Sequence, residues 1–322
     1  MDTLFEIRHV SKYYESKSGI FSGRRRPVKA VEDVSFSIYP GETIGVVGES
    51  GCGKTTLGKA ILHLLPEAEG EVIFQGKDIL KLKGKELREF RKHAQIVYQD
   101  PYTSLNPRST IGKIIGEPLK VQRMAEKSEI KEQVMNMLRV VGLSEDFYGR
   151  YPFECSGGQR QRVGIARAMI MKPELIVCDE AVSALDVSTQ SQIINLLAGL
   201  QKEYNLTYLF ISHGLSVVRH ICSRVLVMYL GRVVEAAECE ELYKNPKHPY
   251  TQALFSSIPL PDPENKKERI MLEGDVPSPV NVPAGCPFHT RCRFTKESCR
   301  QEMPPFYDTG GGHHVACHML NN

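Results

Sequence analysis

Alternating and continuous hydrophobic runs predict that the first third of the chain is rich in strands. Residues 4–10 and 28–38 alternate between apolar and polar positions, which is typical of half-buried strands. Residues 43–47 are apolar and partly β-branched, as expected of a short buried strand. Residues 15–27 lack periodicity and are rich in Ser, Gly and basic side chains, so they predict a loop.

Helical spacing dominates the middle of the chain and is interrupted by short buried strands. Apolar residues recur at helical spacing in the segments 56–62, 81–93, 111–141, 163–171 and 189–204. We expect buried strands at residues 95–99, 175–180 and 207–213, and a hairpin formed by 225–229 and 232–235. Residues 100–108 are predicted to form a turn-rich loop.

One segment carries a specific chemical pattern, G-x-x-x-x-G-K-T, between the strand at 43–47 and a helix. Its residues are Gly48, Glu49, Ser50, Gly51, Cys52, Gly53, Lys54 and Thr55. Glycines in such a loop let backbone N–H groups and the helix N-terminus hold phosphate oxygens. We expect Lys54 to reach the β- and γ-phosphates, Thr55 to bind Mg²⁺ and Thr56 to complete the site. The alternative, a glycine-rich turn with an unrelated lysine, does not account for the strand–loop–helix context.

Polar side chains end two of the buried strands in the second half of the chain. Asp179 and Glu180 follow an apolar run, as at the C-terminal end of a parallel strand that delivers acids to a site. We expect Asp179 to hold Mg²⁺ and Glu180 to orient or deprotonate a water molecule. His213 ends the strand at 207–213, where it is expected to contact the γ-phosphate. The alternative for the two acids is a solvated turn, and for the histidine a structural role.

A second helix N-terminus suited to an anion is expected at Ser156. The serine and two glycines stand directly before a helical run, in the order Cys155, Ser156, Gly157, Gly158 and Gln159. Serine is a favourable helix cap, and a helix N-terminus attracts negative charge. Taken alone, this pattern describes an ordinary capped helix.

Length and composition are those of an ordinary globular protein with one large domain and a smaller one, or two. The chain has 322 residues and a net charge of +3, which does not favour nucleic acid as a partner. We find no apolar run of the roughly 18 residues that cross a bilayer, and the first residues do not resemble a signal peptide. A cytoplasmic protein is therefore expected, in which nine cysteines would not form a disulfide framework.

The order of these motifs resembles that in the ATP-binding subunit of ABC transporters, over roughly residues 4–245. The shared features are the phosphate loop, Gln99, the signature at residues 156–159, the acids at 179–180, the motif at 183–186 and His213. Three further features are similar to the oligopeptide/dipeptide importer branch: the insertion near 15–27 and the segments 102–108 and 245–251. That branch also has a C-terminal extension, which here would be residues 246–322. The resemblance thus implies two domains, 1–245 and 246–322.

The resemblance implies an α/β P-loop NTPase core with an antiparallel β subdomain, a helical subdomain and a small cysteine-containing C-terminal domain. Two ATP molecules would lie between two ATPase subunits, and each signature would act on the nucleotide of the opposing subunit. By the same resemblance, Tyr14 stacks on adenine, with Tyr13 as its neighbouring candidate, and Gln99 senses the γ-phosphate and Mg²⁺. Glu180 is implied as the catalytic base and His213 as the switch histidine. The remaining implied residues are the signature, Ser156, Gly157, Gly158 and Gln159, and the D-loop, Ser183, Ala184, Leu185 and Asp186.

The implied function is ATP hydrolysis that drives import of di- and oligopeptides. The implied partners are a second ATPase subunit, paralogous or identical, two transmembrane permease subunits and, indirectly, an extracytoplasmic peptide-binding protein. The chain would lie at the cytoplasmic face of the cell membrane. Two alternatives stay open: an importer ATPase for nickel or another small solute, and a soluble ABC ATPase without a transport role.

Three residues depart from the family pattern. Cys155 stands where leucine usually opens the signature, and its side chain is expected to pack rather than to contact phosphate. Ala181 follows Glu180 where proline is common, and Gly214 follows His213 where aspartate is usual. Because every residue with direct chemistry is present, we expect a catalytically competent site.

Four cysteines gather near the C-terminus. Cys286, Cys292, Cys299 and Cys317 are separated by five, six and seventeen residues. Four thiols in a short proline-rich segment suggest a metal site. A [4Fe-4S] cluster is preferred because Zn²⁺ sites favour closer pairs, although Zn²⁺ and plain thiols remain alternatives. Substitute ligands would be His289, His313, His314 and His318.

Overall fold

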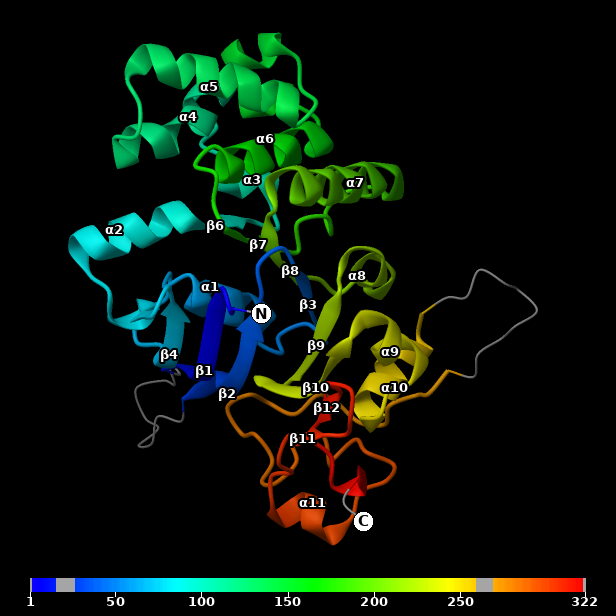
Figure 1. Ribbon diagram of the computed structural model, residues 1–322. Coiled ribbons are helices and arrows are strands. Elements are labelled where there is room, and N and C mark those ends of the chain that lie inside the picture. The colour runs from blue at the N-terminus through cyan, green and yellow to red at the C-terminus, as the bar shows by residue number, and fades with distance from the viewer. Residues whose placement is uncertain (1, 16–26, 259–268, 321–322) are drawn as a thin grey trace, which may run out of the picture. The chain divides into compact units, whose positions relative to one another are not determined.

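The computed structural model describes residues 2–15, 27–258 and 269–320 (Figure 1). Most of the predicted insertion at 15–27 lies outside the described residues, and so do residues 259–268. The chain divides into two compact units. The first contains residues 39–43 and 81–211 with the N-terminal residues, and the second contains 4–38, 44–80 and 212–322.

The first unit contains three parallel strands in the order β6 (Ala94–Val97), β7 (Leu175–Asp179) and β8 (Thr207–Ile211). Every residue of β7 and β8 is buried. Strands covered on both faces are continuously apolar, which is why the sequence pattern predicted them correctly. β6 ends at Val97, so Gln99 lies beyond the strand rather than in it.

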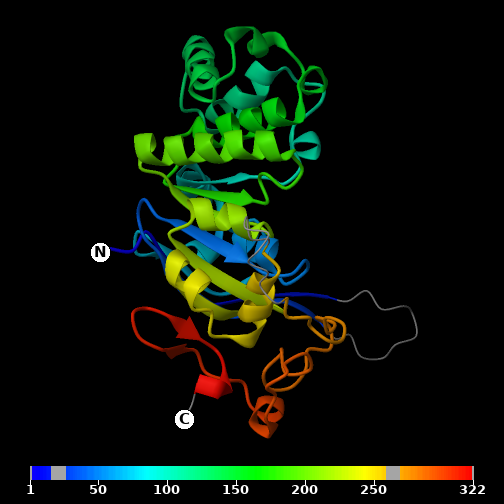
Figure 2. The same ribbon diagram turned by 90° about the vertical axis from the view of Figure 1, so that its right-hand side faces the viewer.

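A helical layer accompanies these strands. It contains α4 (Ile111–Gln122), α5 (Lys127–Val140), α6 (Gly157–Met169) and α7 (Val187–Tyr204). Both views show α6 running beside α7, and α4 packs on α5 and α6 (Figures 1 and 2). The single helix predicted for 111–141 is wrong. Arg123 adopts a left-handed φ of 55° and ends α4, and the Glu129 side chain accepts the Glu126 backbone N–H at 2.8 Å where α5 begins.

Two further α-helices of the first unit are shorter. α2 (Gly84–His93) lies within the helical segment predicted for 81–93. The turn-rich loop predicted for 100–108 is in part a short helix, α3 (Pro101–Ser104). It forms because the Asp100 carboxylate accepts the Tyr102 backbone N–H at 2.7 Å and Pro101 occupies the first helical position, where its missing N–H costs nothing.

The second unit contains an antiparallel sheet formed by the N-terminal strands. Its order is β2 (Val28–Ile38), β1 (Phe5–Tyr14), β4 (Glu69–Phe74) and β5 (Lys77–Asp78). The first two strands match the alternating pattern of the sequence, whereas β4 and β5 were not predicted.

A second sheet of this unit carries the phosphate loop. β3 (Thr43–Val47) pairs in parallel with β9 (Arg224–Tyr229), which forms the predicted hairpin with β10 (Arg232–Glu238). The two turn residues, Leu230 and Gly231, both have positive φ, of 43° and 81°. Two positive φ values are typical of the tight turns that fit the twist of a hairpin.

The C-terminal residues extend this same sheet. β12 (His314–Val315) pairs with β10 and with β11 (Tyr307–Asp308). The other helices of the unit are α1 (Lys54–Ile61), α8 (Leu215–Ile221), α9 (Cys239–Lys244), α10 (Pro249–Ser256) and α11 (Glu297–Gln301). Residues after 245 therefore contribute two strands to a sheet shared with β10. The domain division at residue 245 stays a prediction.

Candidate functional site

The phosphate loop connects β3 to α1 and depends on glycine at two positions. Gly48 and Gly53 have φ values of 152° and 104°, which side chains disfavour. A Cβ atom would lie 2.2 Å from the Met228 carbonyl oxygen at Gly48, and 2.0 Å from the Ala30 carbonyl oxygen at Gly53. The loop therefore fits between two backbone segments only because both positions lack side chains.

Lys54 opens α1 and is buried under the loop. Its Nζ donates to the carbonyl oxygens of Gly48 at 2.9 Å and Glu49 at 3.0 Å. Gly53, the N-cap of α1, has no side chain to satisfy the first N–H groups of the helix. Those groups and the ammonium are suited to bind phosphate oxygens, and Thr55 and Thr56 stand in the same helical turn. The residues present thus fit an ATP phosphate chain with Mg²⁺.

Tyr14 ends β1 and remains 39% exposed. The Nζ of buried Lys12 lies 5.3 Å from the centroid of its ring. An exposed aromatic ring supported by a cation can stack on an aromatic base. Its role toward adenine stays a prediction.

In the first unit, the end of β7 carries the two acids. Asp179 is buried, and Glu180 adopts a left-handed φ of 49°, which non-glycine residues rarely do. The Glu180 backbone N–H donates to the Ile211 carbonyl at 2.9 Å, which holds this strained conformation. Strain of this kind is typical of functional sites.

Gln99 lies against Glu180. Its Nε2 donates to Glu180 Oε2 at 2.8 Å, although 81 residues separate the two in sequence. Parallel pairing of β6 with β7 brings them together, because the C-terminal ends of parallel strands meet at one edge of the sheet. The amide fixes one carboxylate oxygen through this hydrogen bond.

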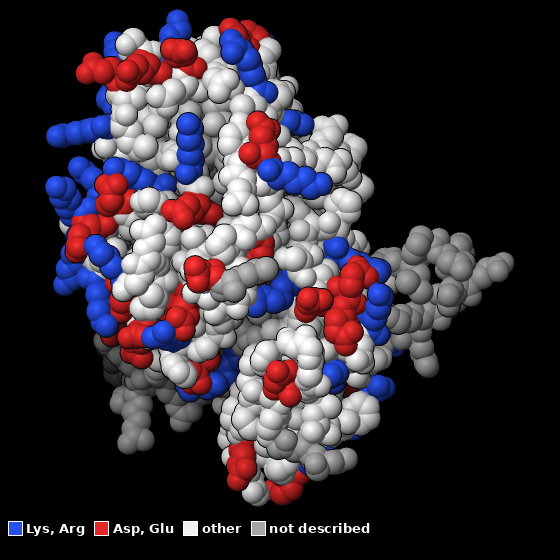
Figure 3. Space-filling model, viewed as in Figure 1, with Lys and Arg blue, Asp and Glu red and all other residues white. Residues whose placement is uncertain are grey.

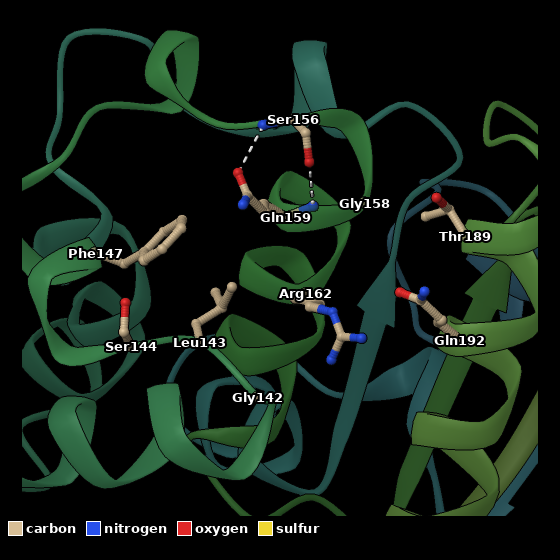
Figure 4. A pocket seen from close by; sticks show the side chains of 10 residues that line it. All are labelled: Gly142, Leu143, Ser144, Phe147, Ser156, Gly158, Gln159, Arg162, Thr189 and Gln192. Carbon is tan, nitrogen blue, oxygen red and sulfur yellow. Dashed lines mark hydrogen bonds between the residues drawn. The ribbon is translucent and has the colours of Figure 1, made fainter.

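Ser156 is the N-cap of α6, as predicted. Its hydroxyl accepts the Gln159 N–H at 3.3 Å, and Gln159 Oε1 accepts the Ser156 N–H at 2.9 Å (Figure 4). This reciprocal capping box orients the helix N-terminus. A Cβ at Gly158 would lie 2.5 Å from Thr189 Cγ2, so glycine is required for α6 to approach α7.

A cavity of about 510 Å³ opens beside this N-terminus (Figure 4). Its lining residues are Gly142, Leu143, Ser144, Phe147, Ser156, Gly158, Gln159, Arg162, Thr189 and Gln192. Arg162 stands one turn after Gln159, and its Nη1 donates to the Val141 carbonyl at 2.6 Å. Sequence reasoning missed Arg162, although the three-residue spacing from Gln159 would have placed both on one helix face.

Ser183, Ala184, Leu185 and Asp186 connect Glu180 to α7. Ser183 Oγ donates to the Glu180 carbonyl at 3.0 Å. Asp186 caps α7: its carboxylate accepts hydrogen bonds from Ser188 and from the backbone and side chain of Thr189, and these lower its pKa. The segment thus links the acidic strand end to the helix that lines the signature cavity.

His213 belongs to the second unit, two residues after the end of β8, and is exposed. The next residue, Gly214, donates its N–H to Ser212 Oγ at 2.9 Å and caps α8. At the other departures from the family pattern, Cys155 and Ala181 are both buried. Cys155 therefore packs in the interior, as expected, and burial raises the pKa of its thiol.

The four C-terminal cysteines lie in one neighbourhood without forming an ion site. Burial, followed by the nearby thiols of Cys299, Cys317 and Cys292, raises the pKa of Cys286 to about 12. Among the described residues, however, no group of three or more His, Cys, Asp or Glu side chains is arranged to hold a metal ion. The geometry therefore does not support the predicted [4Fe-4S] cluster or its Zn²⁺ alternative.

The charged side chains and the helix lengths give two further observations. On the face drawn in Figure 3, basic and acidic side chains are interspersed. Within the parts of the chain that the structure describes, none of the helices combines the length and apolar character needed to span a bilayer.

Comparison with known proteins yields two family matches and close relatives. Residues 31–183 match the ABC transporter family, and residues 234–299 match the oligopeptide/dipeptide transporter C-terminal region. The chain is 53% identical over 323 residues to the oligopeptide transport ATP-binding protein AppF of Bacillus subtilis, covering 99% of this chain and 98% of the relative. It is 50% identical over 321 residues to OppF of Haemophilus influenzae, with coverage of 98% and 97%.

Solved structures give the same result. The ATP-binding cassette MJ0796, in a dimeric post-hydrolysis state bound to ADP and Pi, is 28% identical with a TM-score of 0.65, covering 73% of this chain and 98% of that chain. CbiO1 from Clostridium perfringens is 26% identical with a TM-score of 0.64, covering 76% and 92%. Together with the phosphate loop and the capped signature helix, these matches show that the chain belongs to the ABC transporter ATPases, in the branch that carries the oligopeptide/dipeptide transporter C-terminal region.

Proposed function

We propose that this ABC ATPase energises the import of di- and oligopeptides through separate membrane subunits. The observation that carries the proposal is the pairing of an ATPase core with the oligopeptide/dipeptide transporter C-terminal region in one chain. Two relatives, AppF and OppF, are oligopeptide transport ATP-binding proteins by name, which supports the same cargo. In this proposal the chain binds to permease subunits at the cytoplasmic face of the membrane.

In the proposed mechanism, Lys54 and the N-terminus of α1 hold the phosphates, and Asp179 and Thr55 hold Mg²⁺. The metal neutralises phosphate charge when bound. Glu180 accepts a proton from the attacking water, and the hydrogen bond from Gln99 keeps its carboxylate oriented toward that task. His213 contacts the γ-phosphate, and Tyr14 stacks on adenine.

The signature is proposed to act on the nucleotide of a second ATPase subunit, either identical or paralogous. The capping box at Ser156 and the open cavity beside it support this role, because they leave an oriented helix N-terminus available to an anionic ligand. The D-loop, residues 183–186, would sense closure of the pair through its bond to Glu180.

Transport by the reconstituted complex tests the cargo. The chain, its permease partners and the binding protein are placed in proteoliposomes, and uptake of a labelled tripeptide is compared with uptake of Ni²⁺. ATP-dependent peptide uptake supports the proposal. Uptake of Ni²⁺ alone favours the small-solute alternative, and ATPase activity in a chain that binds no permease favours the soluble class.

We also retain the [4Fe-4S] cluster as a proposal for Cys286, Cys292, Cys299 and Cys317. The clustering of the four cysteines in the sequence supports it. Anaerobic purification with iron, sulfide and zinc analysis tests it. Stoichiometric zinc without iron would favour the Zn²⁺ alternative, and a folded metal-free extension would leave four ordinary thiols.

A further inference from the structure

A residue between two of the C-terminal cysteines binds the phosphate loop directly. Arg291 forms a two-pronged ion pair with Glu49, the second residue of the loop, although 242 positions separate them in sequence. Its Nη1 lies 2.9 Å from Oε2, and its Nη2 lies 3.3 Å from Oε1. Only 8% of the Arg291 side chain and 28% of the Glu49 side chain is exposed. This pair is therefore partly shielded from water, where ion pairs are stronger than at the surface.

A second contact fixes the backbone of the same loop residue. The Glu49 N–H donates to the Tyr250 hydroxyl at 2.9 Å. Tyr250 is fully buried in α10, and its ring centroid lies 5.4 Å from that of buried Phe288, which precedes Arg291 by three residues. The cysteine-bearing segment and α10 thus hold Glu49 together, one by its carboxylate and the other by its backbone.

The position of Glu49 makes its charge consequential. A carboxylate within a phosphate-binding loop repels the anionic phosphates of ATP. The carbonyl oxygen of the same residue accepts a hydrogen bond from Lys54 Nζ, so movement of Glu49 would also displace the ammonium that binds phosphate. A guanidinium on Glu49 counters both effects, because it neutralises the carboxylate and immobilises the residue.

We propose that Arg291 is a positioning residue for ATP binding, through which the C-terminal extension supports the phosphate loop. Arg291 neutralises and orients Glu49, and Glu49 in turn sets the position of Lys54. The extension therefore contributes to nucleotide affinity independently of any cargo it helps to move. The proposal depends on ATP binding by this loop and not on the identity of the transported solute.

Nucleotide titration of the full chain tests this role. Arg291→Gln should raise the Kd for ATP by about three- to tenfold, and should raise that for ADP less, because ADP carries less negative charge. Arg293→Gln is the matched control, since Arg293 is exposed and two residues away. In the assembled transporter, Arg291→Gln should raise KM for ATP while kcat stays within about twofold of the wild type. Wild-type binding in the same series verifies that the loop binds ATP at all.

A double variant separates electrostatic positioning from mere loss of structure. If Arg291 acts by countering the Glu49 charge, removing Arg291 should matter little once that charge is absent. In the E49Q background, Arg291→Gln should therefore change the ATP Kd by less than about twofold, which is roughly the scatter seen between sites that do not interact. Arg291→Lys, which keeps the positive charge, should bind ATP more tightly than Arg291→Gln and less tightly than the wild type. The same three- to tenfold loss in the E49Q background, or wild-type ATP affinity of Arg291→Gln, would overturn the proposal. Thermal unfolding of each variant identifies any that fail to fold. If Arg291→Gln is one of them, the ATP Kd of Arg291→Lys is compared with that of the wild type instead.

Discussion

A single hydrogen bond connects Gln99 to the carboxylate of Glu180 across 81 residues of sequence. The amide donates to Glu180 Oε2, and an ionised carboxylate that accepts hydrogen bonds is the form that a general base requires. The left-handed φ of Glu180 adds a second constraint, because the backbone hydrogen bond to Ile211 holds a conformation that a glutamate does not prefer. The side chain and the backbone of Glu180 are thus each held by a contact with a distant residue.

Replacing Glu180 tests its role as the base. Glu180→Gln keeps the shape and the contact to Gln99 but removes the proton acceptor. We expect ATP binding to persist, with turnover of the complete transporter reduced by about a hundredfold or more. Phosphate release measures turnover, and Glu203→Gln, at an exposed site on α7, is the control. Wild-type turnover in Glu180→Gln would remove this residue from the mechanism.

In the first unit, the helix that carries the signature at its N-terminus is α6. Its N-terminus is held by a capping box, and its first turn approaches α7 so closely that Gly158 faces the Thr189 methyl group. The signature is therefore a packed helix end whose geometry α7 determines. The stability of this helix end follows from its capping box and from this packing.

A rescue experiment tests the packing of α6 on α7. Gly158→Ala should destabilise the chain by about 1–3 kcal/mol, because the new Cβ would lie 2.5 Å from Thr189 Cγ2. Adding Thr189→Ser removes that methyl group, keeps the hydroxyl bonded to Asp186 and should recover most of the loss. Gly164→Ala, later in the same helix, meets no atom within 4 Å and should not destabilise. Urea denaturation measures the free energy of unfolding of the wild type, Gly158→Ala, the double variant and Gly164→Ala. If the double variant is as unstable as Gly158→Ala, the contact with the Thr189 methyl group is not the cause of the loss.

Ser156 provides the matching functional test. Ser156→Arg places a long cation at the N-terminus of α6, where it would block an opposing nucleotide. The isolated chain should bind ATP within about twofold of the wild type, since the change leaves the phosphate loop intact. ATP-dependent dimerisation, followed by size-exclusion chromatography of the E180Q form, should be lost. Ser128→Arg, at an exposed site on α5, is the control. If monomeric Ser156→Arg loses ATP binding, the signature contacts the nucleotide of its own chain and not that of a second subunit.

Across the second unit, the C-terminal extension is joined to the ATPase sheet by a buried polar group. Glu235 in β10 is fully buried and lies 2.7 Å from His313 Nε2. The same carboxylate accepts the backbone N–H groups of Lys247 at 2.7 Å and His248 at 3.0 Å. One side chain of the core thus organises both the start of α10 and the entry into β12.

Removing this carboxylate should loosen the extension. Glu235→Ala leaves one imidazole and two backbone N–H groups without their acceptor in a buried site, which should cost about 3 kcal/mol of unfolding free energy. Glu238→Ala, at an exposed end of β10, should change the same quantity little. Guanidinium unfolding supplies the measurement. Equal midpoints for the two variants would show that Glu235 does not join the extension to the sheet.

Local sequence patterns were sufficient for the elements whose determinants are contiguous. The phosphate loop, the capped helix at Ser156 and the hairpin at Leu230 each depend on neighbouring residues, because glycine conformation, helix capping and turn geometry are local properties. Local patterns gave a wrong result for residues 111–141, where the helical spacing continues across the point at which the helix breaks. The break between α4 and α5 occurs at Arg123, a residue with no turn preference of its own.

Contacts between distant segments depended on the tertiary structure. Gln99 meets Glu180 only through parallel strand pairing, and Arg291 meets Glu49 only because α10 and the cysteine-bearing segment pack beside the phosphate loop. Periodicity along a chain specifies which face of an element is buried but not which partner buries it. The identity of the chemical groups was therefore readable from the sequence, whereas their pairing required the fold.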